Sequence, residues 1–186
     1  MGFARIIVGY LVLSSAELLS TSAVEPPKIG DIAPNFTLKT IDNKSVELRQ
    51  LTEKGKVALV VLRGWPGYQC PLCEQQVHDL VGSAAEWKER NVQILFIYPG
   101  PADQLKDHAK EFLNNKEWPK DFLLVLDPNY KFTTDYGLRW DLKGETAYPS
   151  TFLIDSANKI RFEKISKEHG GRVGSRELLR QIETFK

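Results

Sequence analysis

The stretch that decides the fold is Leu59 to Gln76, LVVLRGWPGYQCPLCEQQ. An apolar run leads through a turn-rich loop into Cys70-Pro71-Leu72-Cys73, which opens a predicted helix. The run from Val57 to Leu62 is apolar throughout and half of its residues are β-branched, which is typical of a strand buried on both faces. This pattern predicts a core strand that ends in a loop and places Cys70 at the entrance of the following helix.

A thiol at a helix entrance has unusual chemistry. It lies against unsatisfied backbone N–H groups and the positive end of the helix dipole, which favour the thiolate and lower its pKa. Cys70 and Cys73 are the only two cysteines of the 186 residues. Residues at i and i+3 on a first helical turn are close enough to form a small disulfide ring. The pair therefore predicts a redox-active dithiol, in which attack and resolution occur within one motif.

Two other uses of a cysteine pair compete with this one. A structural disulfide that closes only two intervening residues would stabilise the fold weakly, because it removes little entropy from the unfolded chain. A zinc site needs about four ligands, and His78, His108 and His169 supply no pattern that would complete one. We expect neither a metal nor another cofactor, and His78 is expected to be a surface histidine.

The N-terminal segment has the order of charges and apolar residues found in secretory signals. Arg5 precedes the apolar stretch from Ile6 to Leu13, and a tract of small residues ends near Ala23. This stretch is too short for a membrane span, which needs about 20 apolar residues. Residues 1–23 are predicted to be a signal peptide of an exported protein, periplasmic or secreted. Contact with a membrane is expected only if the segment stays uncleaved.

The rest of the chain has the length of one domain, which we place at residues 28–186. Lys and Arg number 25 against 24 Asp and Glu, and no basic stripe follows a helix, so a nucleic-acid partner is not expected. The basic cluster from Arg161 to Arg180 is interleaved with acidic residues. We interpret it as a solvated face.

Periodicity and turn residues predict an α/β fold, with helices covering a mixed central sheet. A hairpin is expected over 34–48, with its turn at 42–44. Further strands are expected at 57–62, 93–98, 122–127, 151–155 and 159–165, and helices at 73–90, 102–114, 129–136 and 175–184, the last capped by Ser175. Cys73 falls on the apolar stripe of its helix and is expected to face inward.

This order of elements, with C-x-x-C at a strand-to-helix junction, resembles the thioredoxin fold with an N-terminal β-hairpin extension. Residues 30–38, GDIAPNFTL, look like the G-x-x-A-P-x-F-x-L opening of the AhpC/TSA family, the peroxiredoxin-like redoxins. Residues 148–155, YPSTFLID, are similar to the x-P-x-T-F-x-I-D segment of exported thioredoxin-like members. The resemblance covers residues 28 to 184.

The resemblance implies site residues as well. The family's peroxide site is P-x-x-x-T-x-x-C, in which Pro66 matches the proline, Cys73 matches the cysteine, and Cys70 replaces the threonine. Where the family has an arginine before T-F-x-I-D, this chain has Pro149, the proline that thioredoxins hold in cis opposite their cysteines. Arg63, followed by glycine, fits the branch with a C-P-x-C motif, and it is interpreted either as the missing cation or as a salt-bridged loop residue.

The resemblance implies a thiol-based oxidoreductase with an antioxidant role. It would reduce hydroperoxides or disulfides and be recycled by a thiol reductant such as a thioredoxin-like donor. One alternative is an exported thioredoxin-type protein-disulfide oxidoreductase without peroxidase activity. Another is a non-catalytic copper-binding module that uses the two thiolates with His169. By the thioredoxin precedent Cys70 attacks, being more exposed, and by the peroxiredoxin precedent Cys73 attacks. We expect the first.

Overall fold

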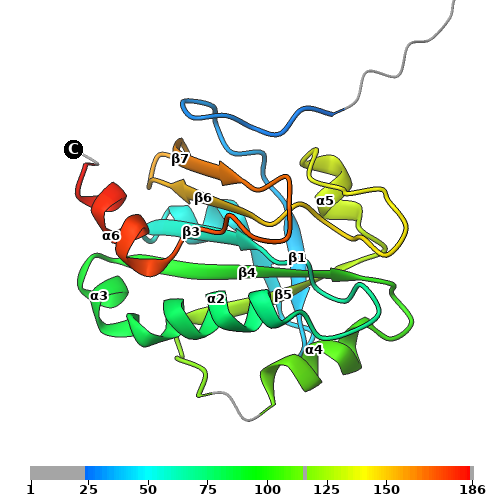
Figure 1. Ribbon diagram of the computed structural model, residues 1–186. Coiled ribbons are helices and arrows are strands. Elements are labelled where there is room, and N and C mark those ends of the chain that lie inside the picture. The colour runs from blue at the N-terminus through cyan, green and yellow to red at the C-terminus, as the bar shows by residue number, and fades with distance from the viewer. Residues whose placement is uncertain (1–23, 115–116, 185–186) are drawn as a thin grey trace, which may run out of the picture.

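The computed structural model describes residues 24–114 and 117–184 (Figure 1). Within them, a seven-stranded sheet has the order β2-β1-β5-β4-β3-β6-β7. Its strands are β1 (Thr37–Thr40), β2 (Ser45–Glu47), β3 (Lys56–Val61), β4 (Val92–Gly100), β5 (Phe122–Pro128), β6 (Ser150–Ile154) and β7 (Ile160–Ile165). The central strands β3, β4 and β5 are parallel, whereas β1, β2, β6 and β7 pair antiparallel with their neighbours. The predicted mixed sheet and the N-terminal hairpin are therefore present.

Helices cover both faces of this sheet. They are α1 (Leu48–Thr52), α2 (Pro71–Gly82), α3 (Ala84–Glu89), α4 (Leu105–Leu113), α5 (Lys131–Asp135) and α6 (Ser175–Glu183). The crossover from β3 to β4 runs through α2 and α3, and the crossover from β4 to β5 runs through α4 (Figure 1). Because the crossovers make β3, β4 and β5 parallel, the carboxyl ends of these three strands lie together at one end of the sheet. The loop after β3 is at this end.

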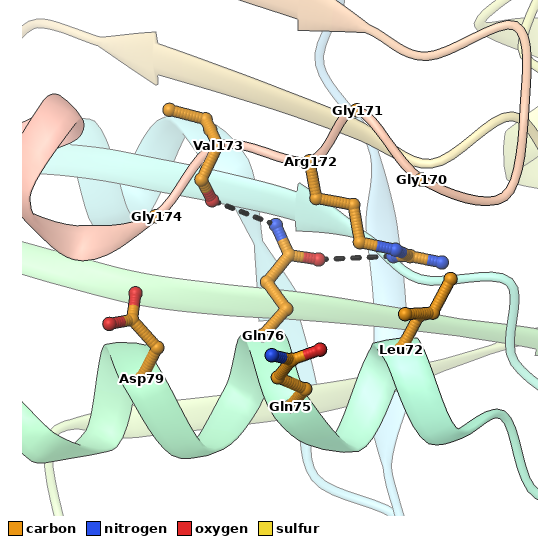
Figure 2. A pocket seen from close by; sticks show the side chains of 9 residues that line it. All are labelled: Leu72, Gln75, Gln76, Asp79, Gly170, Gly171, Arg172, Val173 and Gly174. Atoms are coloured by element: carbon orange, nitrogen blue, oxygen red, sulfur yellow. Dashed lines mark hydrogen bonds between the residues drawn. The ribbon is translucent and has the colours of Figure 1, made fainter.

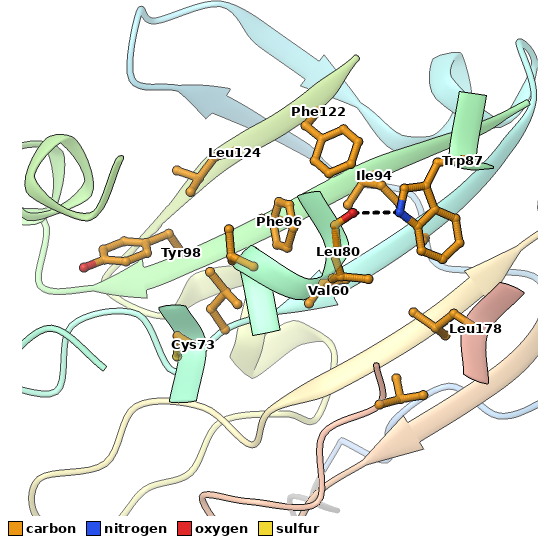
Figure 3. Close-up of a cluster of buried hydrophobic side chains, with 14 of the residues drawn as sticks. Val60, Cys73, Leu80, Trp87, Ile94, Phe96, Tyr98, Phe122, Leu124 and Leu178 are labelled. Atoms are coloured by element: carbon orange, nitrogen blue, oxygen red, sulfur yellow. Dashed lines mark hydrogen bonds between the residues drawn. The ribbon is translucent and has the colours of Figure 1, made fainter. Parts of the chain in front are cut away.

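The core is divided into two layers by the sheet. Successive side chains of a strand point to opposite faces. Ala58 and Val60 pack with residues of α2, α3, α4 and α6, and Val57 and Leu59 pack with residues of α1 and α5. Figure 3 shows the first layer, in which Trp87 of α3 donates its ring N–H to the Leu80 carbonyl at 2.8 Å. The apolar run of β3 is thus buried on both sides, as its composition predicts.

Two helix predictions need correction. The single helix expected over 73–90 is broken at Ser83, whose φ of −104° and ψ of 25° are not helical. Gly82 and Ser83 both favour helix weakly. The last helix begins as predicted, but its cap residue is Gly174 rather than Ser175. Ser175 instead donates its N–H and hydroxyl to Asp79 of α2 at 2.6 and 3.1 Å, which ties the two helices together.

The predicted signal peptide, residues 1–23, lies outside the described residues. Within residues 24–114 and 117–184, none of the helices has the length and apolar character that a bilayer crossing requires. The division into a signal peptide and a domain at 28–186 stays a prediction.

Candidate active site

The loop between β3 and α2 is held against the end of β4. Leu62 donates its N–H to the Ile97 carbonyl at 3.0 Å, and Trp65 donates its N–H to the Pro99 carbonyl at 3.0 Å. Between them, Gly64 has a φ of 63°, and a β-carbon there would collide with the Pro99 backbone. Only glycine fits this left-handed, closely packed position. The Arg63-Gly64 pair therefore fixes the path of the chain toward Cys70.

Cys70 is the N-cap of α2. Its sulfur accepts the Cys73 backbone N–H at 3.3 Å, and its φ of −82° and ψ of 109° are those of an extended cap residue. The Cys73 thiol also donates a hydrogen bond to it, and this is the largest cause that lowers the pKa of Cys70 to about 6. Burial opposes the shift, whereas the Cys73 N–H and the charges of Arg172 and Arg63 add to it. Cys70 is therefore the thiol that is ionised at neutral pH.

Cys73 lies one turn into α2 and faces the core, as predicted (Figure 3). Burial raises the pKa of its thiol well above the ordinary range, and its hydrogen bond to Cys70 raises that pKa further. The two pKa values are therefore shifted in opposite directions. A single shared proton stays on Cys73 and stabilises the thiolate of Cys70.

Cys70 is the more exposed of the two cysteines, as expected, but both are buried and the margin is small. Its exposed fraction is 2%, against 0% for Cys73. The sulfur turns back over the first turn of α2 to accept the Cys73 N–H, and a guanidinium lies beside it. The difference between the two pKa values comes from the burial of Cys73, from the hydrogen bond between the two thiols and from the charges of neighbouring arginines.

That guanidinium belongs to Arg172, in the segment between β7 and α6. Its Nη2 lies 3.5 Å from the Cys73 sulfur and 3.8 Å from the Cys70 sulfur. Its Nη1 donates to the Gln76 side-chain oxygen at 3.1 Å (Figure 2). Its Nε donates to the His169 carbonyl at 3.2 Å. Gln76 in turn donates to the Val173 carbonyl at 3.3 Å. Arg172 is therefore fixed over the cysteine pair, beside a groove of about 360 Å³ between α2 and residues 170–174.

The sequence interpretation missed Arg172. The cluster from Arg161 to Arg180 is expected from sequence to be a solvated face, and for Arg172 this is wrong. The one local signal is the Gly170-Gly171 pair before it, because Gly171 has a φ of 67° and turns the chain toward α2.

Arg63, the predicted cation, has another arrangement. It is 3% exposed, and its Nη2 lies 2.9 Å from a Glu145 carboxylate oxygen. Its Nη1 donates to the Tyr68 hydroxyl at 2.9 Å, and the Thr146 hydroxyl donates to its backbone carbonyl. Its charge lowers the pKa of Cys70 less than that of Arg172 does. Arg63 therefore joins the cysteine loop to residues 144–146 and is partly neutralised by Glu145.

Of the two predicted prolines, Pro66 lies within the loop before α2 and Pro149 directly precedes β6. Pro66 is half-buried between β3 and α2, and Pro149 is buried at the entrance of β6. No described peptide bond is cis, so the expected cis form of the bond before Pro149 is wrong. The chain runs extended here, with Tyr148 donating to the Leu138 carbonyl at 2.9 Å and Ser166 donating to the Pro149 carbonyl at 2.9 Å. The trans form, which is intrinsically favoured, satisfies these bonds.

The histidines lie apart from the cysteine pair. His169 Nε2 lies 2.8 Å from a Glu145 carboxylate oxygen, and His78 is exposed on α2, as expected. His108 stacks on Trp65 with ring centroids 3.5 Å apart. Among the described residues, no group of three or more His, Cys, Asp and Glu side chains is placed to hold a metal ion.

Comparison with known sequences points to redox proteins. The AhpC/TSA family profile matches residues 29–163. The thiol-disulfide oxidoreductase ResA of a Bacillus cereus strain is 30% identical over 144 residues, which are 77% of this chain and 73% of ResA. The chloroplastic peroxiredoxin Q of Triticum aestivum is 29% identical over 133 residues, 72% of this chain and 57% of that protein.

Solved structures with the same fold include peroxiredoxins. Peroxidoxin BcpB from Mycobacterium tuberculosis has a TM-score of 0.66 at 19% identity, covering 86% of this chain and 98% of that chain. The yeast mitochondrial 1-Cys peroxiredoxin has a TM-score of 0.69 at 20% identity, covering 84% of this chain and 75% of that chain. These likenesses identify a thioredoxin-like fold. The matched family segment ends before Arg172.

Proposed function

Because the chain belongs to the AhpC/TSA family, whose members here are thiol-based oxidoreductases, we propose that Cys70 and Cys73 are its catalytic dithiol. Cys70 is the attacking thiolate and Cys73 the resolving thiol, and the preferred substrate is a disulfide. Arg63, Pro66 and Pro149 support the site by fixing the loop and the strand entrance around it.

The observation that carries the proposal is the opposite shift of the two pKa values. A pKa of about 6 makes Cys70 largely thiolate at pH 7, whereas Cys73 stays protonated. An attacking thiol needs thiolate character, and a resolving thiol must wait as a protonated neighbour. The peroxiredoxin precedent, in which Cys73 attacks, requires the less ionised sulfur to act first.

The disulfide reaction has two steps. The Cys70 thiolate attacks one sulfur of the substrate, its disulfide bond breaks, and the first substrate thiolate leaves. Cys73 then loses its proton to water and attacks the Cys70 sulfur, which expels the second substrate thiolate. The substrate gains two electrons and the Cys70-Cys73 disulfide forms. A thiol reductant of the thioredoxin-like class would restore the dithiol by the reverse exchange.

A hydroperoxide is the second candidate substrate, and two observations favour it. The exposed fraction of Cys70 is only 2%, which suits a small substrate, and the Arg172 cation lies against both sulfurs. In this reaction the Cys70 thiolate attacks the outer peroxide oxygen, the O–O bond breaks, and the alkoxide leaves with a proton from water. Cys73 then attacks the sulfenic acid, and water leaves as the disulfide forms. A cation stabilises the charge that develops on the departing oxygen.

Large hydrophobic side chains favour a protein as the disulfide substrate. Tyr68, two residues before Cys70, and Leu72, between the two cysteines, are exposed. An exposed apolar rim beside a reactive thiol suits a polypeptide partner.

Export to an oxidising compartment, through residues 1–23, would require such a system to be supplied with a reductant.

The test is a pair of assays run on the same preparation, with dithiothreitol as the reductant. One follows the reduction of insulin disulfides and the other the consumption of hydrogen peroxide. We expect insulin reduction to be abolished by Cys70→Ser and strongly slowed by Cys73→Ser. Loss of neither activity in Cys70→Ser would overturn the assignment of Cys70 as the attacking thiol. Peroxide consumption faster than insulin reduction would make the second candidate the function.

A further inference from the structure

We propose that Arg172 is a catalytic residue that stabilises negative charge on the Cys73 sulfur when Cys73 resolves the mixed disulfide. This inference rests on the proposed function, because it assigns a role within the two-step exchange. The residue lies outside the segment that the family profile matches, and it is 99 residues from Cys73 in the sequence.

The resolving step needs a cation because it places a negative charge on the buried Cys73 sulfur. Once Cys70 is bonded to a substrate sulfur, Cys73 must become a thiolate in a buried place where burial raises its pKa. The largest effect that lowers this pKa is the charge of Arg172, followed by a backbone hydrogen bond from Arg63. The Nη2 of Arg172 is 3.5 Å from the Cys73 sulfur, a distance at which a cation acts strongly in a partly desolvated site.

Arg172 has its charge available for this task. Its other partners are neutral, namely the Gln76 side-chain oxygen and the His169 carbonyl. Among the described residues, no carboxylate lies within ion-pair distance of it, and Asp79, which lines the same groove, is hydrogen-bonded to Ser175. Arg63, by contrast, is paired with Glu145. Of the two arginines near the dithiol, Arg172 is therefore the one whose charge acts on the sulfurs without compensation.

The guanidinium geometry also orients this charge. Nη1 and Nε are engaged with Gln76 and His169, so Nη2 is the nitrogen left to face both sulfurs. A rigid fork with several donors can meet all of these partners at once, whereas a lysine ammonium is a point charge on a flexible stem. Arg172→Lys is thus expected to restore part of the effect and not all of it.

The experiment uses dipyridyl disulfide, which is uncharged near neutral pH, with the reduced full chain. Attack by Cys70 releases one thiopyridone, and attack by Cys73 on the resulting mixed disulfide releases a second, so stopped-flow absorbance separates the two steps. In Arg172→Gln we expect the second phase to slow roughly tenfold, as a one-unit rise in the pKa of Cys73 would do. The first phase should slow less, because hydrogen bonding from Cys73 is the larger stabiliser of Cys70.

The controls distinguish a loss of the Arg172 charge from a general effect of removing a surface charge and from misfolding. Arg176→Gln removes an exposed charge on α6 and should leave both phases unchanged. The pH midpoint of the second phase should rise in Arg172→Gln and return part of the way in Arg172→Lys, which a merely structural role would not produce. If the Gln variant does not fold, Arg172→Met, which keeps the stem, carries the same expectation. A second phase with unchanged rate and pH midpoint would overturn the role of Arg172. Release of only one thiopyridone by the wild type would overturn the proposed function itself.

Discussion

The hydrogen bond from the Cys73 thiol to the Cys70 sulfur is the contact that separates the two cysteines chemically. It is the largest cause of the lowered pKa of Cys70 and also contributes to the raised pKa of Cys73. One proton thus serves both residues. The side chain at position 73, on the first turn of α2, is therefore expected to set the reactivity of Cys70, ahead of the nearby arginines.

Substitution of Cys73 tests this directly. Serine keeps a donor at the position and alanine removes it, so the pKa of Cys70 should lie near 6 in Cys73→Ser and higher in Cys73→Ala. The rate of iodoacetamide alkylation as a function of pH measures both values. Equal midpoints in the two variants would show that the side chain at position 73 does not stabilise the Cys70 thiolate.

Arg63 is expected to matter for stability. Truncation in Arg63→Met leaves the half-buried Glu145 without its cation and removes the bond to Tyr68. Breaking a buried ion pair in this way costs roughly 3 kcal/mol. Urea unfolding measures the change, with Arg161→Gln as a control, since its partly exposed pair with Asp155 should be worth less than about 1 kcal/mol. Similar losses in both variants would contradict a special role for the Arg63 pair.

At the level of residues, the sequence was sufficient to place the cysteine pair at a helix entrance with Cys73 facing inward, since spacing and apolar periodicity are local features. It did not identify Arg172, which is 99 residues from Cys73 in the chain. The expected cis bond before Pro149 failed for a related reason. The backbone groups on either side of that bond are hydrogen-bonded to Leu138 and Ser166, which come from other parts of the fold.

Among the secondary-structure elements, α2 and α6 act as one unit around the site. Asp79 of α2 accepts two hydrogen bonds from Ser175 at the start of α6, and the segment that carries Arg172 lies directly before it. In effect, a side chain of one helix caps the other, satisfying a first-turn N–H group that has no partner within its own helix. The position of Arg172 therefore depends on how α6 is anchored to α2.

Asp79→Ala is expected to destabilise the protein by about 1 kcal/mol, the usual effect of losing a helix cap. Urea unfolding measures this, and Asp107→Ala is a matched control because that carboxylate is exposed in the first turn of α4. The site should respond as well, with a slower second thiopyridone phase in Asp79→Ala only. A normal second phase combined with the loss of stability would show that Arg172 is held without α6.

The elements themselves were predictable where local pattern decides them. The apolar run of β3 and the hairpin turn at Asn43, with a φ of 63°, follow from composition and turn residues. The break between α2 and α3 was missed, because the apolar stripe continues across Ser83 to Trp87. The backbone at Ser83, with a ψ of 25°, separates the two helices, and Trp87 then packs in the core with its ring N–H on the Leu80 carbonyl.

For the whole molecule, the topology brings three distant segments to one place. The loop after β3 supplies the dithiol, residues 144–146 hold Arg63, and the segment after β7 supplies Arg172. The order of elements and the family motifs were sufficient to predict the thioredoxin-like fold. The assembly of cations around the sulfurs required the actual sheet order, because it depends on which loops meet at the carboxyl ends of the strands.

The ionisation of Cys70 should be visible in the reduction potential of the molecule. A lowered pKa stabilises the reduced folded form at pH values above it, and this stabilisation is lost as the pH falls through about 6. Reduction takes up two protons below this pKa and one above it, while Cys73 stays protonated. The potential should therefore fall by about 59 mV per pH unit below the break and about 30 mV above it. Equilibration with glutathione at several pH values measures the slopes, and a single slope across pH 5 to 8 would contradict the lowered pKa.

The central claim is that Cys70 is the attacking thiol, and site-resolved labelling of the reduced wild-type protein tests it most directly. The chain is treated at pH 7 with less than one equivalent of iodoacetamide, digested, and the label located by peptide mass mapping. The account predicts that the label lies on Cys70, because its thiolate is populated at this pH and that of Cys73 is not. Label found mainly on Cys73 would contradict it.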